Sequence, residues 1–282
     1  MTFLAMIIAL VLVQVWGSGN RVQHDDWFHS LQGRVASWGL LPEIRLAALV
    51  LLPALALQLL LNILEPLLFG VLWIALATFA LLYSMGRRDF HELLERYRTQ
   101  CRGEDFEGAY LTTLVELGWT AESDDPVSPS EVHALVQRGF FYEGYQRWFA
   151  VLFYFVLLGP AGALAYRLLQ LCRNQFEAQL VERALYLVDW IPARLLAAAF
   201  SLAGDFVASR DTLFHGVTNT SLEAPQLLQT VGQDALGAGL DVPNPDEPFG
   251  EYAAGQNLEL ASLLYRSAAC WVALVALLVL LD

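Results

Sequence analysis

Lysine is absent from this chain, whose 16 basic residues are all arginine and stand against 29 acidic residues. The formal net charge of −13 argues against nucleic acid as a partner, because an acidic surface repels phosphates. Cysteine is also scarce: three are present, an odd number, and no C-x-x-C pattern occurs. We therefore expect neither a disulfide framework nor a zinc site.

Signatures of common enzyme classes are missing as well. The chain has no G-x-x-x-x-G-K-[ST] loop, no G-x-G-x-x-G turn, no H-E-x-x-H and no G-x-S-x-G. These patterns mark phosphate-binding loops, dinucleotide sites, zinc proteases and hydrolases with a serine nucleophile. Whether the chain is an enzyme stays open at this point, with a role other than catalysis favoured.

Long apolar runs are abundant, and 56% of the residues are hydrophobic. Such runs predict an all-α, polytopic integral membrane protein whose partner is the lipid bilayer. The first run carries no positively charged n-region, so we expect a retained helix rather than a cleaved signal. Pro66 is predicted to lie in the first turn of the third helix. Four runs are predicted to cross the membrane: 1–16, 46–64, 66–85 and 264–281.

Five segments are predicted along the chain. They are three transmembrane helices with a short polar loop (1–85), a soluble helical insert (86–146), a central membrane block (147–208), an acidic loop with proline and glycine (209–263) and a C-terminal transmembrane helix (264–282). The insert has a net charge of −6, from 12 acids and six arginines, and the acidic loop −7, from eight acids and one arginine. Arginines directly after the third helix place the insert in the cytoplasm by the positive-inside rule, which makes the N-terminus periplasmic.

Helices are also predicted in the polar segments. In the insert, apolar residues at helical spacing before and after Gly103 predict a helical hairpin. Ser128, Pro129 and Glu131 match a serine N-cap, a proline at N1 and a glutamate at N3, which predicts the start of the next helix. Between residues 20 and 45, His24, Asp25, Asp26 and His29 could bind a metal. The favoured interpretation there is an amphipathic helix whose apolar side holds Trp27, Phe28, Leu31 and Val35.

Charged residues and a Gly-Pro pair interrupt the apolar sequence of the central block. A charge at mid-depth in a membrane helix costs about 3 kcal/mol on insertion scales, so such residues face a partner or a cavity. The break at Gly159-Pro160 frees backbone groups that only protein or water can satisfy. We therefore favour re-entrant or interfacial helices over full crossings for 148–166 and 191–207.

Pro192 is predicted to fix a helix start near 189–191, where free N–H groups favour an anion. Arg194 would add a permanent positive charge with a planar donor fork. The candidate ligand-binding residues are Tyr166, Arg167, Asp189, Pro192, Arg194 and Asp205. A structural interpretation stands beside this one, in which Asp189 caps the helix and pairs with Arg194. Ala193, Ala197 and Ser201 have the small-xxx-small spacing of close helix packing.

The residues of this block resemble those of the AmpE family. The resemblance implies an inner-membrane signalling modulator of β-lactamase induction in a Gram-negative bacterium, functionally linked to an amidase of peptidoglycan recycling. It is carried by Arg147-Trp-Phe-Ala-Val-Leu-Phe-Tyr-Phe, Leu158-Gly-Pro-Ala-Gly-Ala-Leu-Ala-Tyr-Arg167, Asp189-Trp-Ile-Pro-Ala-Arg-Leu195, Leu202-Ala-Gly-Asp-Phe206 and, in the insert, Gly103-Glu-Asp-Phe-Glu-Gly-Ala109.

Tyr166-Arg167 and Ile191-Pro-Ala-Arg-Leu195 are also similar to the wider CobD/CbiB family of cobamide biosynthesis. That similarity implies an alternative function, an ATP-dependent amide ligase or transferase. The chain departs from that branch after Arg167, where Leu168-Leu-Gln-Leu-Cys-Arg-Asn stands in place of a stretch with an acid and hydroxyls. A structural membrane scaffold is the third hypothesis. The cofactor is unknown, and ATP or another phosphate-bearing ligand is the class that the block would suit.

Overall fold

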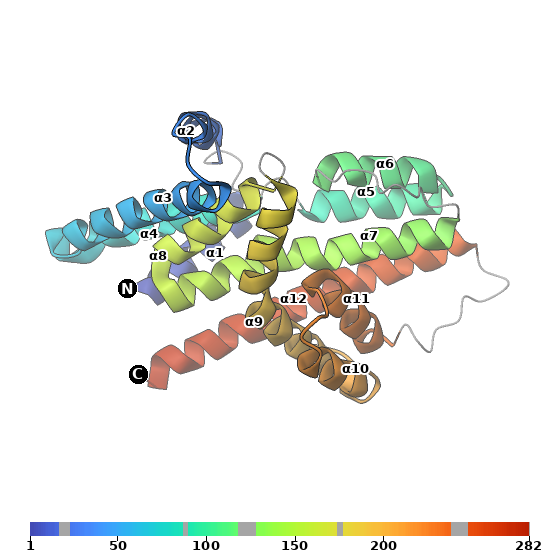
Figure 1. Cartoon of the computed structure of the whole chain (residues 1–282). Helices are drawn as coiled ribbons and strands as arrows, with labels where there is room; N and C mark the ends of the chain where they lie inside the picture. Colours follow the sequence, from blue (N-terminus) through green and yellow to red (C-terminus); the bar gives the residue numbers. More distant parts are fainter. Residues whose placement is uncertain (17–22, 87–89, 118–127, 174–176, 238–247, 282) are drawn as a thin grey trace. The chain divides into compact units, whose positions relative to one another are not determined.

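The computed structural model describes residues 1–16, 23–86, 90–117, 128–173, 177–237 and 248–281, and all regular elements in these ranges are helices (Figure 1). This confirms the predicted all-α class. The helices are α1 (Thr2–Trp16), α2 (Asp26–Ala36), α3 (Pro42–Leu64), a 3-10 helix (Leu67–Gly70), α4 (Val71–Ser84), α5 (Phe90–Arg102), α6 (Phe106–Leu117), α7 (Pro129–Gly144), a π-helix (Tyr145–Phe149), α8 (Ala150–Leu171), α9 (Ala178–Ala203), α10 (Phe206–Thr218), α11 (Ala224–Ala235) and α12 (Phe249–Leu281).

Among the described residues, five helices are long and apolar enough to cross a membrane, which confirms a polytopic membrane protein. Both central helices, predicted as re-entrant, interfacial or spanning, are in this set, and α1 is a shorter apolar helix. The five are Pro42–Leu64, Leu67–Ser84, Pro129–Leu171, Ala178–Ala203 and Phe249–Leu277.

The chain forms two compact units. The first contains Met1–Arg88, Gln146–Pro192 and Val275–Asp282, and the second contains Asp89–Tyr145 and Ala193–Leu274. The chain passes between them inside the π-helix, directly after Pro192 in α9, and near the end of α12. Each unit is described below by itself.

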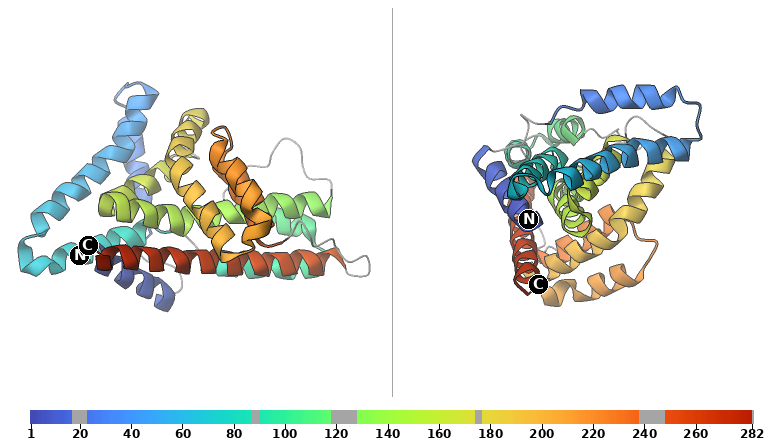
Figure 2. Two further views of the ribbon diagram at one scale, coloured as in Figure 1. Left: turned by 90° about the horizontal axis from the view of Figure 1, so that it is seen from below. Right: turned by 90° about the vertical axis from the view of Figure 1, so that its left-hand side faces the viewer.

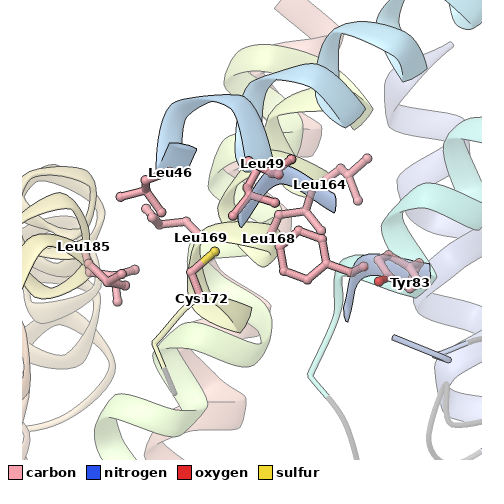
Figure 3. Packing of buried hydrophobic residues seen from close by; sticks show 11 residues of the cluster. Leu46, Leu49, Tyr83, Leu164, Leu168, Leu169, Cys172 and Leu185 are labelled. Carbon is pink, nitrogen blue, oxygen red and sulfur yellow. The ribbon is translucent and has the colours of Figure 1, made fainter. Parts of the chain in front are cut away.

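The core of the first unit is built around the second half of α8 (Figure 3). Leu164, Leu168 and Leu169 pack there with Leu46 and Leu49 of α3. Tyr83 of α4 and Leu185 of α9 belong to the same buried cluster. Figure 2 shows α3 and α4 as a helical hairpin, and both helices pack on α8 while α1 packs on α4.

The helix α2 confirms the amphipathic interpretation of the first polar loop, except that Trp27, predicted on its apolar side, is 43% exposed. Phe28 and Val35 are buried. At the start of α2, Trp27 donates from its indole N–H to the Tyr83 hydroxyl at 3.0 Å, and that hydroxyl donates to the Asp25 carboxylate at 2.8 Å. Asp25 therefore holds α2 to the end of α4 through Tyr83.

The turn between α3 and α4 differs from the prediction. Leu68 and Phe69 have φ of 48° and 55°, and Gly70 is left-handed with φ 80°. Left-handed residues cannot continue a right-handed helix, so α4 begins at Val71. The expectation that Pro66 lies in the first turn of the next helix is wrong.

The second unit contains the predicted helical hairpin, α5 and α6, joined across by an ion pair between Arg96 and Glu116 at 3.3 Å. The predicted start of α7 is confirmed, because Ser128 and Glu131 form a reciprocal capping box with Pro129 at the first position. Three helices bury a polar network in this unit: the Tyr97 hydroxyl lies 2.9 Å from His133 Nδ1, and His133 Nε2 lies 3.1 Å from Gln256 Oε1.

The segment 209–263, predicted as an acidic loop, is largely helical. It contains most of α10, all of α11 and the first half of α12, which begins at Phe249 rather than near residue 259. The prediction of a loop rested in part on the prolines of this segment. Pro225, however, lies in the first turn of α11, where the missing N–H of proline costs nothing.

Candidate functional site in the central membrane block

The predicted break in the central block is a sharp turn inside α8. Gly159 has φ 74° and ψ −169°, which is not helical, and Pro160 follows it. Twelve residues of straight helix would separate Tyr154 from Tyr166 by about 18 Å. Their rings stack instead, with centroids 5.3 Å apart and planes at 22°. The two halves of α8 therefore fold back on each other at Gly159 (Figure 1).

The arms of this turn are short. The apolar stretch 148–158 spans about 16 Å and 160–171 about 18 Å by helix rise, whereas the hydrocarbon core of a bilayer is about 30 Å thick. The whole helix Pro129–Leu171 is long enough to cross, but the turn at Gly159 divides its apolar part. This geometry favours the re-entrant interpretation of α8.

Two tyrosines connect the arms of α8 to adjacent residues of α9. Tyr166 donates from its hydroxyl to Asp189 Oδ1 at 2.8 Å, and Asp189 is 1% exposed. Tyr154 donates to the backbone carbonyl of Val188 at 2.7 Å. The stacked pair thus satisfies one buried carboxylate and one backbone acceptor on the same turn of α9. Tyr166 and Asp189, two predicted site residues, are brought together.

Pro192 explains the second of these bonds. In a helix each N–H bonds the carbonyl four residues earlier, and proline has no N–H. The carbonyl that Pro192 leaves open belongs to Val188, the carbonyl to which the Tyr154 hydroxyl donates. The Tyr154 side chain of α8 therefore replaces the backbone hydrogen bond that α9 lacks at the Val188 carbonyl.

The predicted helix start near residues 189–191 is wrong. The helix α9 is continuous from Ala178 to Ala203, with Pro192 in its interior. Asp189 is accordingly not a helix cap, and no free helix N-terminus lies beside it to attract an anion. The prediction failed because proline suits a first helical turn but is equally tolerated inside a membrane helix when another group satisfies the freed backbone.

The π-helix before α8 is a second backbone irregularity with polar partners. The wider turn leaves carbonyls available, and the Arg147 carbonyl accepts the Gly86 N–H at 3.2 Å. The Gln146 carbonyl accepts from the Gln170 side chain at 3.5 Å, and Gln170 in turn accepts from Arg167 at 2.9 Å. Arg167, a predicted site residue, is thereby held along the last turn of α8.

The remaining candidates, Arg194 and Asp205, lie in the second unit. Arg194 is 7% exposed and donates from Nη2 to the Asn219 carbonyl at 2.8 Å. Asp205 caps α10 by accepting the N–H groups of Val207 and Ala208 at 2.9 and 3.0 Å. Asp205, predicted as a ligand-binding residue, therefore has a structural contact as the N-cap of α10.

Close packing is observed where the small-residue spacing predicts it. Ala193, Ala197 and Ser201 are all fully buried, and Phe200 on the same helix packs against Phe141 with ring centroids 5.5 Å apart. Sequence reasoning missed Tyr154 and Asn219, the partners of the Val188 carbonyl and of Arg194. The sequence signal for Tyr154 is indirect: a proline at 192 inside a helix leaves the Val188 carbonyl without its backbone donor, so a donor from another segment is expected.

In the first unit the chemistry is that of two phenols and a buried carboxyl group, and in the second unit it is that of a buried guanidinium, Arg194. A model of the family described as "Regulatory signalling modulator protein AmpE" matches residues 1–239. No curated protein and no solved structure matches the chain.

Proposed function

Because the chain belongs to the AmpE family of regulatory signalling modulators, we propose that it modulates the response to cell-wall stress, of the kind that induces β-lactamase, from the bacterial inner membrane. The type of stress and the inner-membrane location are what the resemblance of the central block to the AmpE family implies. A functional link to an amidase of peptidoglycan recycling is part of the same proposal.

The observation that carries the proposal is the buried Asp189, held by Tyr166 in a helix long and apolar enough to cross a membrane. An ionisable residue in such a helix is expensive and is normally kept for function. The Tyr166 hydroxyl that donates to this carboxylate lies on a folded-back helix, so the contact is sensitive to any movement of that helix. We take this contact as the element whose state the signal changes.

The route of the signal follows the continuous helices between the units. The chain passes from one unit to the other in the π-helix and directly after Pro192. Both features interrupt the regular backbone bonding of a helix and are places where helices bend. A change at the Tyr166–Asp189 contact would therefore reach the second unit along α9, because Asp189 lies three residues before Pro192.

An anionic ligand, such as ATP or another phosphate-bearing molecule, remains part of the proposal. It is supported by Arg194, a buried guanidinium that donates to the Asn219 carbonyl. Guanidinium has five N–H donors and pairs with phosphate in a bidentate manner. Tyr166, Arg167, Asp189 and Pro192 are proposed to shape the response on the first unit.

The experiment compares Arg194→Ala and Asp189→Asn with Arg183→Ala in a strain whose own copy is deleted, with β-lactamase induction as the response. Arg183 is an exposed arginine on the same helix and is the matched control. We expect the first two variants to lose the response at normal protein levels and the control to keep it. Purified Arg194→Ala should also lose a thermal shift that ATP or inorganic phosphate gives the unsubstituted chain.

The outcomes separate the parts of the proposal. A normal response in Asp189→Asn would remove the carboxylate from the mechanism. Low protein for Arg194→Ala, with level and response restored by Asp189→Asn in the same chain, would show that the two charges serve structure alone. Rescue of a strain unable to attach the cobamide linker would support the ligase alternative over the signalling role.

A reporter tests the orientation. A reporter active only in the periplasm, fused at Pro126, which lies outside the described residues, should be silent because 86–146 is proposed to be cytoplasmic. Activity there would invert the orientation and place the N-terminus in the cytoplasm.

A further inference from the structure

The helix α10 has three sides of different character. With about 100° of rotation per residue, Phe206, Val217, Phe214 and Val207 fall within an arc of about 100°, and all four are exposed. Asp211, His215 and Thr218 form a polar arc beside it, and they are exposed too. The third side holds the buried Ser209 and Gly216.

The buried side of α10 packs on α11 within the second unit. A Cβ on Gly216 would lie 2.2 Å from Leu227 Cδ1, so the two helices approach closely there. The Thr212 hydroxyl donates to Asp234, and the Asp205 N–H donates to the Ala235 carbonyl at 2.7 Å. These contacts fix which side of α10 faces the protein and which side faces outward.

Exposed apolar residues are also present on α9, the helix directly before α10. Leu195 and Leu202, seven residues apart and therefore on one face, are 42% and 75% exposed on a helix that is long and apolar enough to cross a membrane. Only Gly204 and Asp205 separate this helix from α10, where Val207 is 85% and Phe214 61% exposed. A surface of this kind in a membrane protein is covered by lipid.

We propose that α10 is a membrane-surface helix whose apolar arc, Phe206, Val207, Phe214 and Val217, inserts into the interfacial region of a phospholipid bilayer. The polar arc then faces water and the third side faces α11. The helix lies in the plane of the interface, as amphipathic helices with one apolar and one polar exposed side do. At thirteen residues, about 20 Å, it is too short to cross.

Arg210 fits this arrangement although it lies inside the apolar arc. Its guanidinium pairs with Asp211 of the polar arc at 3.0 Å. Long arginine stems lie along apolar surface while the charged group reaches the headgroups or water. Arg210 would therefore be unfavourable if α10 lay in the hydrocarbon core, but it is compatible with a helix at the interface.

The test measures depth in the bilayer with a nitroxide on single substitutions in the full chain, reconstituted one chain per nanodisc of phosphatidylethanolamine and phosphatidylglycerol. Val207→Cys and Phe214→Cys report the apolar arc, and Asp211→Cys and His215→Cys are matched controls on the polar arc. Cys270→Ala is included in all four because Cys270 is exposed, whereas the other two cysteines are buried.

We expect collisions with oxygen, relative to a water-soluble nickel complex, to be several-fold more frequent at positions 207 and 214 than at 211 and 215. Equal access of the nickel complex to all four positions would overturn the proposal. Exclusion of both reagents from 207 and 214 would also overturn it, because protein would then cover the arc. All four positions are exposed, so the substitutions leave the packed side of α10 intact.

Discussion

The bond from Tyr154 to the Val188 carbonyl should matter only while residue 192 is proline. In the unsubstituted chain Tyr154→Phe removes the donor of the 2.7 Å bond and leaves the carbonyl unsatisfied, because Pro192 cannot replace it. An unsatisfied buried acceptor costs about 1–3 kcal/mol. With Pro192→Ala in the same chain, a backbone N–H is available to that carbonyl, so Tyr154→Phe should cost less than about 1 kcal/mol.

The assay is a double-mutant cycle on unfolding of the purified chain in detergent, followed by loss of helical circular dichroism. We expect a coupling energy of about 1–2 kcal/mol, within the range found for residues that share a bond. Pro53→Ala is the control: Pro53 also lies inside a helix, α3, but it leaves a different carbonyl open. Its cycle with Tyr154→Phe should be additive. Additivity in the Pro192 cycle would refute the idea that the phenol replaces the backbone donor.

Three further predictions concern single positions. Tyr166→Phe should destabilise the chain by about 1.5–3 kcal/mol, the value of a hydrogen bond to a charged group. Asp189→Asn keeps an oxygen acceptor and should destabilise the chain less. Equal losses of stability for the two variants in detergent unfolding would contradict a bond to a charged carboxylate. Gly159→Ala should cost about 1–2 kcal/mol, because φ 74° is unfavourable for a residue with a Cβ, whereas Gly33→Ala in α2, where a Cβ meets nothing within 4 Å, should not destabilise. Burial raises the pKa of the Cys101 thiol to about 11, so the thiolate is scarce between pH 7 and 9, and a water-soluble maleimide should modify Cys101 only after unfolding; modification of the folded chain at pH 8, located by peptide mass, would show that the thiol is accessible.

Much of the fold follows from the sequence because its signals are local. Apolar runs predict membrane helices whatever they pack against, and the Ser128 capping box is made by residues three apart. Gly159-Pro160 predicts a break because glycine adopts backbone angles that are not helical and the following proline has no N–H for a helical bond. The direction of the chain after that break does not follow from the pair, since it depends on which side chains the two arms of α8 can satisfy.

The site could be predicted only in part for the same reason. The motifs identify Tyr166 and Asp189, whose side chains do meet, but the partner of the Val188 carbonyl is 34 residues away in the chain. Pro192 has two common positions, the first turn of a helix and the interior of a membrane helix, and the choice depends on that distant donor. The motif identifies Arg194 as a candidate but places it in the first turn of a helix, which is wrong, and the Asn219 carbonyl to which it donates carries no signal in its residue type.

Three backbone irregularities lie in the central block, in addition to the left-handed turn between α3 and α4. The π-helix, the turn at Gly159 and Pro192 all lie between residues 145 and 192, and each weakens regular helix bonding. At each of the π-helix and Pro192, a specific donor from another segment satisfies a backbone carbonyl, Gly86 and Tyr154 respectively. Such an arrangement has a cost that simple spanning helices avoid. Its presence in a member of a family of signalling modulators fits the proposal that bonds of this kind, which water or a regular helix bond can replace, are the ones that change with the signal.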